Sequence, residues 1–231
     1  PCKAGGRGGP MHYTDVPAGR VLLRHAADLY GFSNGLILLK AKGADLRDWL
    51  ERSASAFNRV TPGPADLAQP LIDPAFASYN FDRLDGLRYE IDLSQPARTT
   101  AEGDRRDPGP GRIRNLRLSD GRPVRDTDAY LVVTNAYRAA GGGKFSAVQA
   151  CETLHESTDP VRNALMAHFV ANPQGLDPCI EPSFTFTPLQ GAPVILHTGP
   201  GAAAYPHRIR DLGLVPDGVE PDGFARYLMK I

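Results

Sequence analysis

An unbroken apolar run and the amphipathic stretch that follows it anchor the fold predicted for this chain. The run Gly35–Lys40 holds four consecutive aliphatic residues, which predicts a buried strand covered on both faces. In Ala44–Asn58, apolar residues recur at helical spacing and charged residues occupy the other face. The predicted apolar stripe consists of Leu46, Trp49, Leu50, Ala54 and Phe57, and the predicted polar face of Asp45, Arg47, Asp48, Glu51 and Arg52.

The other periodic segments mix strands and helices in no regular order. Alternation or apolar character predicts strands at 87–93, 113–118 and 130–134, and helices at 21–30 and 160–171, the latter with Leu165, Met166 and Phe169 inward. The absence of regular βαβ units favours an α+β architecture, a mixed β-sheet with packed helices. Residues 176–231 are rich in Pro and Gly, with short strands at 183–187 and 193–198. They predict a β-rich C-terminal extension within one domain spanning 1–231.

Composition excludes several classes of partner. The chain has 231 residues, is 42% hydrophobic and carries no formal net charge. Binding to a nucleic-acid polymer relies on a surplus of cations, so no such partner is predicted, whereas a single nucleotide needs only a few local cations. No apolar run approaches the roughly 18–20 residues of a membrane span, so no membrane association is predicted. The first residue is Pro1 and not Met, which predicts a processed chain or a piece of a longer protein.

The residue types that carry catalysis and metal binding show no supporting pattern. The three cysteines, Cys2, Cys151 and Cys179, form no CxxC pair, which favours buried thiols and leaves one disulfide with a spare thiol as an alternative. The six histidines occur singly, with no HxH, DxH or HExxH string, and no GxSxG elbow is present. We therefore predict no catalytic residue, no metal ligand and no cofactor in this chain.

The segment Thr134–Phe145 has the composition of a ligand-binding loop. A predicted strand ends in a polar pair, and an aromatic residue, a cation and three glycines follow. The GGGK string does not fit a phosphate-binding P-loop, because Arg138 replaces its first glycine and Phe145 replaces the hydroxyl that would hold magnesium.

Four features of the sequence form a candidate nucleotide site, and each has a plainer alternative. Tyr137 can stack on a base, or it belongs to the core. Tyr79, in the string Ser78–Asp82, is a second candidate ring with the same alternative. The glycines Gly141, Gly142 and Gly143 form either an anion-binding nest of backbone N–H groups or a flexible turn. Arg7, between two glycine pairs, either reaches a phosphate or belongs to a mobile terminus.

These residues also match a family pattern, and the chain resembles the C-terminal domain of the bacterial 5′-nucleotidase family. Within that family it is most similar to the bifunctional 2′,3′-cyclic-nucleotide 2′-phosphodiesterase/3′-nucleotidases. The matching strings are, in chain order, Lys3–Gly9, Tyr13–Gly19, Ala27–Tyr30, Asp48–Ala54, Phe57–Asn58, Ser78–Asp82, Asp85–Gly86, Tyr89–Leu93, Gln95–Arg98, Thr134–Ala139, Gly141–Gly143 and Gly223–Tyr227. The likeness runs from Lys3 to the end of the chain.

The resemblance implies a division of labour between two domains. An N-terminal metallophosphoesterase domain holds two divalent metals and hydrolyses the phosphoester, and its motifs are expected before Pro1. The C-terminal domain binds the nucleotide between two aromatics, which fall on Tyr79 and Tyr137. Arg7 falls near the phosphate, and Asn34 and Asn80 match asparagines of the substrate pocket. The chain departs from the family pattern at Ser33–Leu36, where a PNTL-like string is usual, and at Ala136, where an asparagine is usual.

The resemblance therefore predicts a function for the whole protein and another for this chain. The whole protein is expected to be a periplasmic phosphoric ester hydrolase of nucleotide catabolism. The chain is expected to bind a nucleotide or nucleoside and to be inactive alone. A nucleoside- or nucleotide-binding module that stands alone, without catalytic activity, is the alternative.

Overall fold

A computed structural model describes residues 9–64, 67–106, 109–177 and 181–231. The chain divides into two compact units. Among the described residues, unit 1 takes Thr14–Trp49 and Val124–Pro182, and unit 2 takes the remainder. Mixed helices and sheets occur as predicted, and no described helix has both the length and the apolar character needed to cross a bilayer. The assignment of 1–231 to one domain with an extension from 176 stays a prediction.

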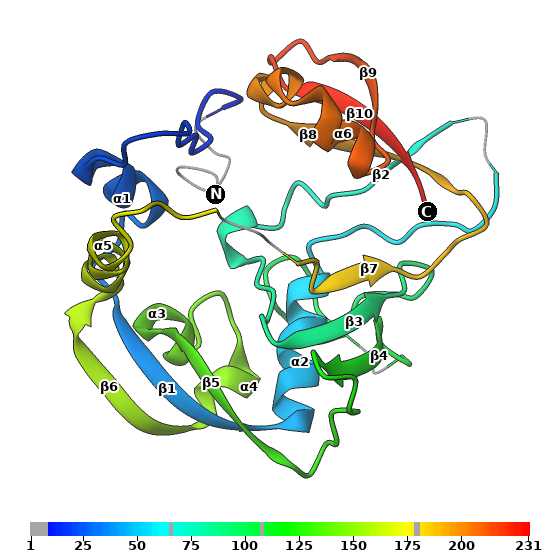
Figure 1. The fold of residues 1–231 in the computed structure, drawn as a ribbon. Helices are drawn as coiled ribbons and strands as arrows, with labels where there is room; N and C mark the ends of the chain where they lie inside the picture. The colour runs from blue at the N-terminus through cyan, green and yellow to red at the C-terminus, as the bar shows by residue number, and fades with distance from the viewer. Residues whose placement is uncertain (1–8, 65–66, 107–108, 178–180) are drawn as a thin grey trace. The chain divides into compact units, whose positions relative to one another are not determined.

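Unit 1 is built on a three-stranded antiparallel sheet (Figure 1). Its central strand is β1 (Gly35–Lys42), flanked by β5 (Ala129–Asn135) and β6 (Glu152–Pro160). The helices of unit 1 are α1 (Leu23–Leu29), the first residues of α2 (Gly43–Ala54), α3 (Ala136–Ala139), α4 (Ser146–Gln149) and α5 (Val161–Ala171).

Burial of β1 differs from the expectation of two covered faces. Ile37, Leu39 and Ala41 are buried, whereas Leu38 is only half-buried and Lys40 is exposed. Partners in an antiparallel pair share a face, so this second face continues onto β5. An antiparallel sheet can leave one face to solvent, which explains why an apolar run did not mean two covered faces. In α5, likewise, no residue is fully buried, so its predicted inward residues are only half-buried.

Unit 2 contains two sheets, each with one parallel pair. In the first, β3 (Leu87–Ile91) lies between β4 (Ile113–Leu118) and β7 (Phe184–Phe186), which pairs with it in parallel. The second has the order β2-β8-β10-β9, with bounds Gln69–Pro70, Pro193–Thr198, Ala225–Lys230 and Val215–Val219. The described residues of the unit also form the short helices η2 (Ser78–Asn80), η3 (Pro200–Ala204) and α6 (Pro206–Asp211). The predicted strands of this unit are confirmed.

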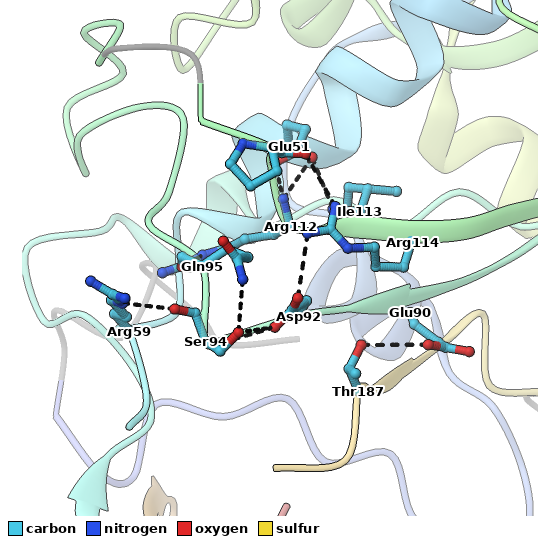
Figure 2. A network of polar contacts seen from close by, with 11 residues as sticks. Glu51, Arg59, Glu90, Asp92, Ser94, Gln95, Arg112, Ile113, Arg114 and Thr187 are labelled. Atoms are coloured by element: carbon cyan, nitrogen blue, oxygen red, sulfur yellow. Dashed lines mark hydrogen bonds and ion pairs between the residues drawn. The ribbon is translucent and has the colours of Figure 1, made fainter. Parts of the chain in front are cut away.

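The helix α2 confirms its apolar stripe but not its polar face. The helix ends at Ala54, four residues before the predicted end at Asn58. Its four apolar positions Leu46, Trp49, Leu50 and Ala54 are buried, and Phe57 is buried beyond the helix, in a β-bridge with Ile72. Glu51 and Arg52 are buried too, with 2% and 5% exposed. The Glu51 carboxylate accepts the backbone N–H groups of Arg112 and Ile113 at 2.8–2.9 Å (Figure 2). A carboxylate that accepts several N–H bonds can be buried because its lone pairs stay satisfied. The chain around Arg112 thus folds over a helix face that the sequence pattern assigned to solvent.

Candidate functional site

Tyr137 stands at the start of a short helix that follows β5. The side-chain oxygen of Asn135 accepts the backbone N–H of Arg138 at 2.8 Å and so caps α3. Tyr137 as a residue is 42% exposed, so the alternative of a core tyrosine is not what the structure shows. The end of β5 and the Asn135 cap together fix the position of the Tyr137 backbone, and so the point from which its side chain extends.

The glycines beside Tyr137 provide a surface for its ring. A Cβ placed on Gly142 would lie 2.5 Å from two atoms of the Tyr137 ring, so only a residue without a side chain allows this approach. The N–H groups of Gly141 and Gly142 donate to the carbonyls of Arg138 and Tyr137, both at 2.9 Å. These two donors are therefore used inside the loop, which contradicts the predicted anion-binding nest for them. The φ angles of Gly141 and Gly143, 81° and 77°, explain why the turn needs glycine.

Arg138 lies inside the loop and braces it. The residue is only 3% exposed, and its guanidinium carbon lies 3.8 Å from the centroid of Phe145 and 5.5 Å from that of Tyr137. The guanidinium also donates to the Gly142 carbonyl. Phe145, with 1% exposed, packs edge-on against Trp49 at 6.5 Å between ring centroids. Arg138 therefore ties the loop to the core of unit 1.

Asn34 lies directly before β1, at the same end of the sheet as Tyr137. In the register of the sheet, Leu36 pairs with Asn135 on β5, and Gly35 pairs with Pro160 on β6. The side-chain amide of Asn34 donates to the hydroxyl of Tyr30 at 3.2 Å. The backbone carbonyl of Asn34 accepts the N–H of Val161 at 2.8 Å. Its position beside Tyr137 is therefore set by the sheet.

Phe32 is an exposed aromatic that the sequence analysis did not single out. It lies in the loop between α1 and β1, two residues before Asn34, and is 68% exposed. Its ring meets Tyr30 edge-on, with 6.2 Å between centroids. The signal available in the sequence was an aromatic surrounded by turn-forming residues, Gly31, Ser33 and Asn34.

The other predicted site residues belong elsewhere in the chain. Tyr79 and Asn80 lie in η2 of unit 2, where Tyr79 is 49% exposed and Asn80 is buried with 7% exposed. The pairing of Tyr79 with Tyr137 around one base stays a prediction. Arg7 lies outside the described residues, as do Cys2 and Cys179.

The described residues hold no group of three or more His, Cys, Asp or Glu side chains that could bind a metal ion. Cys151 is half-buried, and burial raises the pKa of its thiol to about 11. Such a thiol stays protonated near neutral pH and is a poor nucleophile. The described part of unit 1 thus contains an exposed tyrosine, Tyr137, that lies against bare backbone, with the Asn34 amide at the same end of the sheet. A second exposed aromatic, Phe32, lies in the loop before β1.

Comparison with known proteins places this geometry in a family. The 5′-nucleotidase, C-terminal domain family matches residues 6–150. The trifunctional nucleotide phosphoesterase protein YfkN of Bacillus subtilis is 32% identical over 230 residues, which are 100% of this chain and 16% of that protein. A 2′,3′-cyclic-nucleotide 2′-phosphodiesterase/3′-nucleotidase of Haemophilus influenzae is 38% identical over 196 residues, 83% of this chain and 29% of that protein.

A solved structure supports the fold. The 5′-nucleotidase precursor from Thermus thermophilus superposes with a TM-score of 0.53 at 20% identity, covering 74% of this chain and 29% of that one. The chain therefore spans less than a third of the length of each of these proteins. Family match, curated relatives and fold agree with one another, and the chain belongs to the 5′-nucleotidase family, as its C-terminal domain.

Proposed function

We propose that this chain binds and orients a nucleotide for a phosphodiesterase/nucleotidase, with the base stacked on Tyr137. The observation that carries the proposal is the platform itself: Gly142 covers one side of the ring, and 42% of Tyr137 remains exposed for a ligand. Stacking on an aromatic ring contributes about 1–3 kcal/mol per base and accepts any base. Asn34, at the same end of the sheet, supplies an amide that can hydrogen-bond a base edge or a sugar.

The second ring of the base site has two candidates. The family resemblance assigns it to Tyr79, with Asn80 beside it. Phe32 is more exposed than Tyr79 and follows α1 in the same unit as Tyr137. A site-directed comparison of the two is therefore part of the test.

In this proposal the hydrolysis is performed elsewhere in the whole protein. Two divalent metals, held by a metallophosphoesterase domain that precedes this chain, would supply an activated water and polarise the phosphoryl group. The residues of this chain bind the base, position the phosphate and exclude alternative orientations. The relatives, which are longer and carry phosphoesterase names, favour this assignment over a stand-alone binding module. The proposal includes a periplasmic location and a role in nucleotide catabolism.

Calorimetric titration of adenosine into the chain tests the proposal. Tyr137→Ala should weaken adenosine binding about 5- to 150-fold, the range that follows from losing one stacking contact. Tyr137→Phe keeps the ring and should bind within about twofold of the parent chain. Phe32→Ala and Tyr79→Ala then identify the second ring by which of them weakens binding. Adenosine binding that survives Tyr137→Ala unchanged would overturn the assignment of the base site.

A further inference from the structure

Tyr79 is an exposed residue on a segment whose other parts are buried. The segment runs from Phe76 to Asp82 in unit 2 and contains η2. Phe76 and Asn80 are 5% and 7% exposed, whereas Tyr79 between them is 49% exposed. Within the described stretch 73–86, η2 is the only helix or strand. The position of the Tyr79 ring therefore depends on contacts that other parts of unit 2 make with this segment.

Ser53, in the last turn of α2, holds one end of the segment. Its hydroxyl donates to the backbone carbonyl of Asp82 at 2.5 Å and accepts the N–H of the same residue at 2.7 Å. Ser53 is only 2% exposed. A hydroxyl donates once and can accept as well, so this side chain satisfies both backbone groups of Asp82 at once. The backbone just after η2 is thereby tied to α2.

Arg52, the neighbour of Ser53 in α2, holds the other end of the segment. Its guanidinium carbon lies 5.0 Å from the centroid of the Phe76 ring, which is within the range of a cation–π contact. The same guanidinium donates to the hydroxyl of Ser55 at 2.7 Å and to the carbonyl of Ala101 at 3.0 Å. Arg52 is 5% exposed, so the cation below Phe76 is itself fixed inside unit 2.

Phe81 adds an apolar anchor beside Asp82. Its ring meets Phe57 and Phe184 edge-on, with 5.4 Å and 5.9 Å between centroids. These contacts and those of α2 fix the backbone on both sides of Tyr79, while Tyr79 itself stays exposed. An exposed ring on a fixed backbone suits ligand binding, because the ligand does not have to order the ring when it binds.

We propose that Ser53 and Arg52 are positioning residues for nucleotide binding, because they hold the two ends of the segment that presents Tyr79 to a base. The inference rests on the proposed function for the identity of the ligand. It also selects Tyr79 as a ring that contacts the base. Neither Ser53 nor Arg52 touches the nucleotide in this proposal, and both act through the backbone of the segment 76–82.

Amide hydrogen exchange, followed by NMR, tests the hold on the segment without a ligand. The N–H groups of Asn80 and Phe81 donate to backbone carbonyls of the same turn at 2.8 and 3.1 Å, so their exchange rates report its order. Ser53→Ala should raise both rates about tenfold. It should leave unchanged the rate of the Asp92 amide, which donates to the carbonyl of Arg112 at 2.8 Å. Parent rates at Asn80 and Phe81 in Ser53→Ala would overturn the inference.

The contribution of Arg52 is tested from the side of the ring, because its guanidinium also bonds Ser55 and Ala101. Phe76→Leu keeps an apolar side chain and removes the cation–π contact. It should raise the two η2 exchange rates about two- to fivefold, less than Ser53→Ala, because no buried polar group loses its partner. Unchanged rates in Phe76→Leu would remove Arg52 from the proposal.

A double-mutant cycle with adenosine, measured by calorimetry, separates positioning from a general structural role. Ser53→Ala should weaken adenosine binding about two- to tenfold in the parent chain and leave it unchanged in a Tyr79→Ala chain, because the effect passes through that ring. Equal weakening in both backgrounds would contradict positioning. Ser183→Ala is the matched control, since this serine of unit 2 is 1% exposed and its hydroxyl meets the Asp85 side chain at 3.4 Å, outside the segment 76–82.

The failure of this inference can be told apart from the failure of the proposed function. If Tyr79→Ala leaves adenosine affinity at the parent value, Tyr79 has no part in base binding and the positioning roles fall with it. The result for Tyr137→Ala still decides the base site of the proposed function. Because exchange and affinity are both compared at a temperature where all variants are folded, a loss of global stability alone changes neither the η2 rates relative to Asp92 nor the cycle.

Discussion

Arg112 in unit 2 and Arg138 in unit 1 are both almost fully buried, with 1% and 3% of their surface exposed. Arg112 donates to three backbone carbonyls, those of Gln95, Ala54 and Phe57, at 2.6–2.9 Å. Arg138 donates to the carbonyl of Gly142 and lies against aromatic faces. The first arginine joins three chain segments of one unit, whereas the second braces a single loop that presents a ring.

The difference shows that a buried arginine can stabilise a core in one unit and support a candidate binding site in the other. Around Arg112 and Glu51 the polar groups are directed at the chain itself, as Figure 2 shows for the Glu51 carboxylate. Around Arg138 the guanidinium holds the loop, while the residue Tyr137 remains 42% exposed. Closed hydrogen bonding is typical of a core, and a braced but open aromatic surface is typical of a binding site.

Removing the Arg112 guanidinium should have the largest effect on stability. Arg112→Leu leaves three carbonyls without their donor and removes the cation that interacts with the buried Glu51 carboxylate. We expect a loss of about 3–5 kcal/mol in the free energy of unfolding, measured by urea denaturation. Arg114→Gln is the control, since its 3.4 Å pair with Asp92 is partly exposed and should be worth less than about 1 kcal/mol. Equal effects of the two substitutions would contradict a special role for Arg112.

Arg138→Lys should affect stability less and nucleotide binding more. Lysine keeps the charge but loses the planar group that stacks on Phe145 while bonding the Gly142 carbonyl. We expect a loss of about 2 kcal/mol in the free energy of unfolding, together with weaker adenosine binding because Tyr137 loses its brace. Urea denaturation and calorimetry on the same protein check both. If stability falls and adenosine binding stays constant, Arg138 serves the core alone.

The regions also differ in what the sequence could predict about them. Local periodicity predicted the apolar stripe of α2, because that stripe depends only on helical spacing. It misplaced Glu51, since the chain that buries this carboxylate lies about sixty residues further on, at Arg112 and Ile113. Strand β6 was missed because it is a polar edge strand with hardly any buried position. Side-chain and backbone partners that lie far apart in sequence leave no periodic signal.

Within the candidate site, the sequence could predict the exposure of a single residue, Tyr137, whereas its role in binding stays a prediction. Tyr137 follows a strand and precedes glycines, and its exposure agrees with the predicted ring. The nest prediction was wrong for Gly141 and Gly142 because their N–H groups close a tight turn on α3. Phe32 was overlooked because one exposed aromatic has no spacing to detect. The pairing of Tyr79 with Tyr137 stays a prediction.

Gly142→Ala tests the ring platform with the smallest possible change. The added methyl would lie 2.5 Å from two atoms of the Tyr137 ring and 2.6 Å from the Tyr137 backbone oxygen, so the ring and the loop backbone both have to shift. We expect adenosine binding to weaken about tenfold, which corresponds to about 1.4 kcal/mol. Gly201→Ala is the matched control, because nothing lies within 4 Å of a Cβ at that position. Parent-like adenosine affinity in Gly142→Ala would show that the contact with Gly142 does not position the ring.

The closed core of unit 2 should also respond to alkaline pH through Tyr89 and Arg112, in opposite directions. Burial raises the pKa of Tyr89, so above about pH 10 the unfolded chain loses the phenol proton while the native chain keeps it, and stability falls with pH. Burial lowers the pKa of Arg112 to about 10, so there the native chain releases a proton that the unfolded chain keeps, and stability rises. The two effects offset each other in the parent chain.

Tyr89→Phe removes the contribution of Tyr89, which lowers the free energy of unfolding as pH rises, and leaves that of Arg112, which raises it. Relative to the parent, its free energy of unfolding should therefore increase by about 1 kcal/mol per pH unit above pH 10, and the difference should be constant between pH 7 and 9. Urea denaturation across this range measures both regimes on the same two proteins, so that any pH-independent loss of the Tyr89 hydroxyl cancels. A difference that stays flat up to pH 11 would mean that the Tyr89 hydroxyl reaches solvent often enough to ionise in the native state. The core of unit 2 would then be less closed than its hydrogen bonds indicate, and its contrast with the open ring of unit 1 would be one of degree.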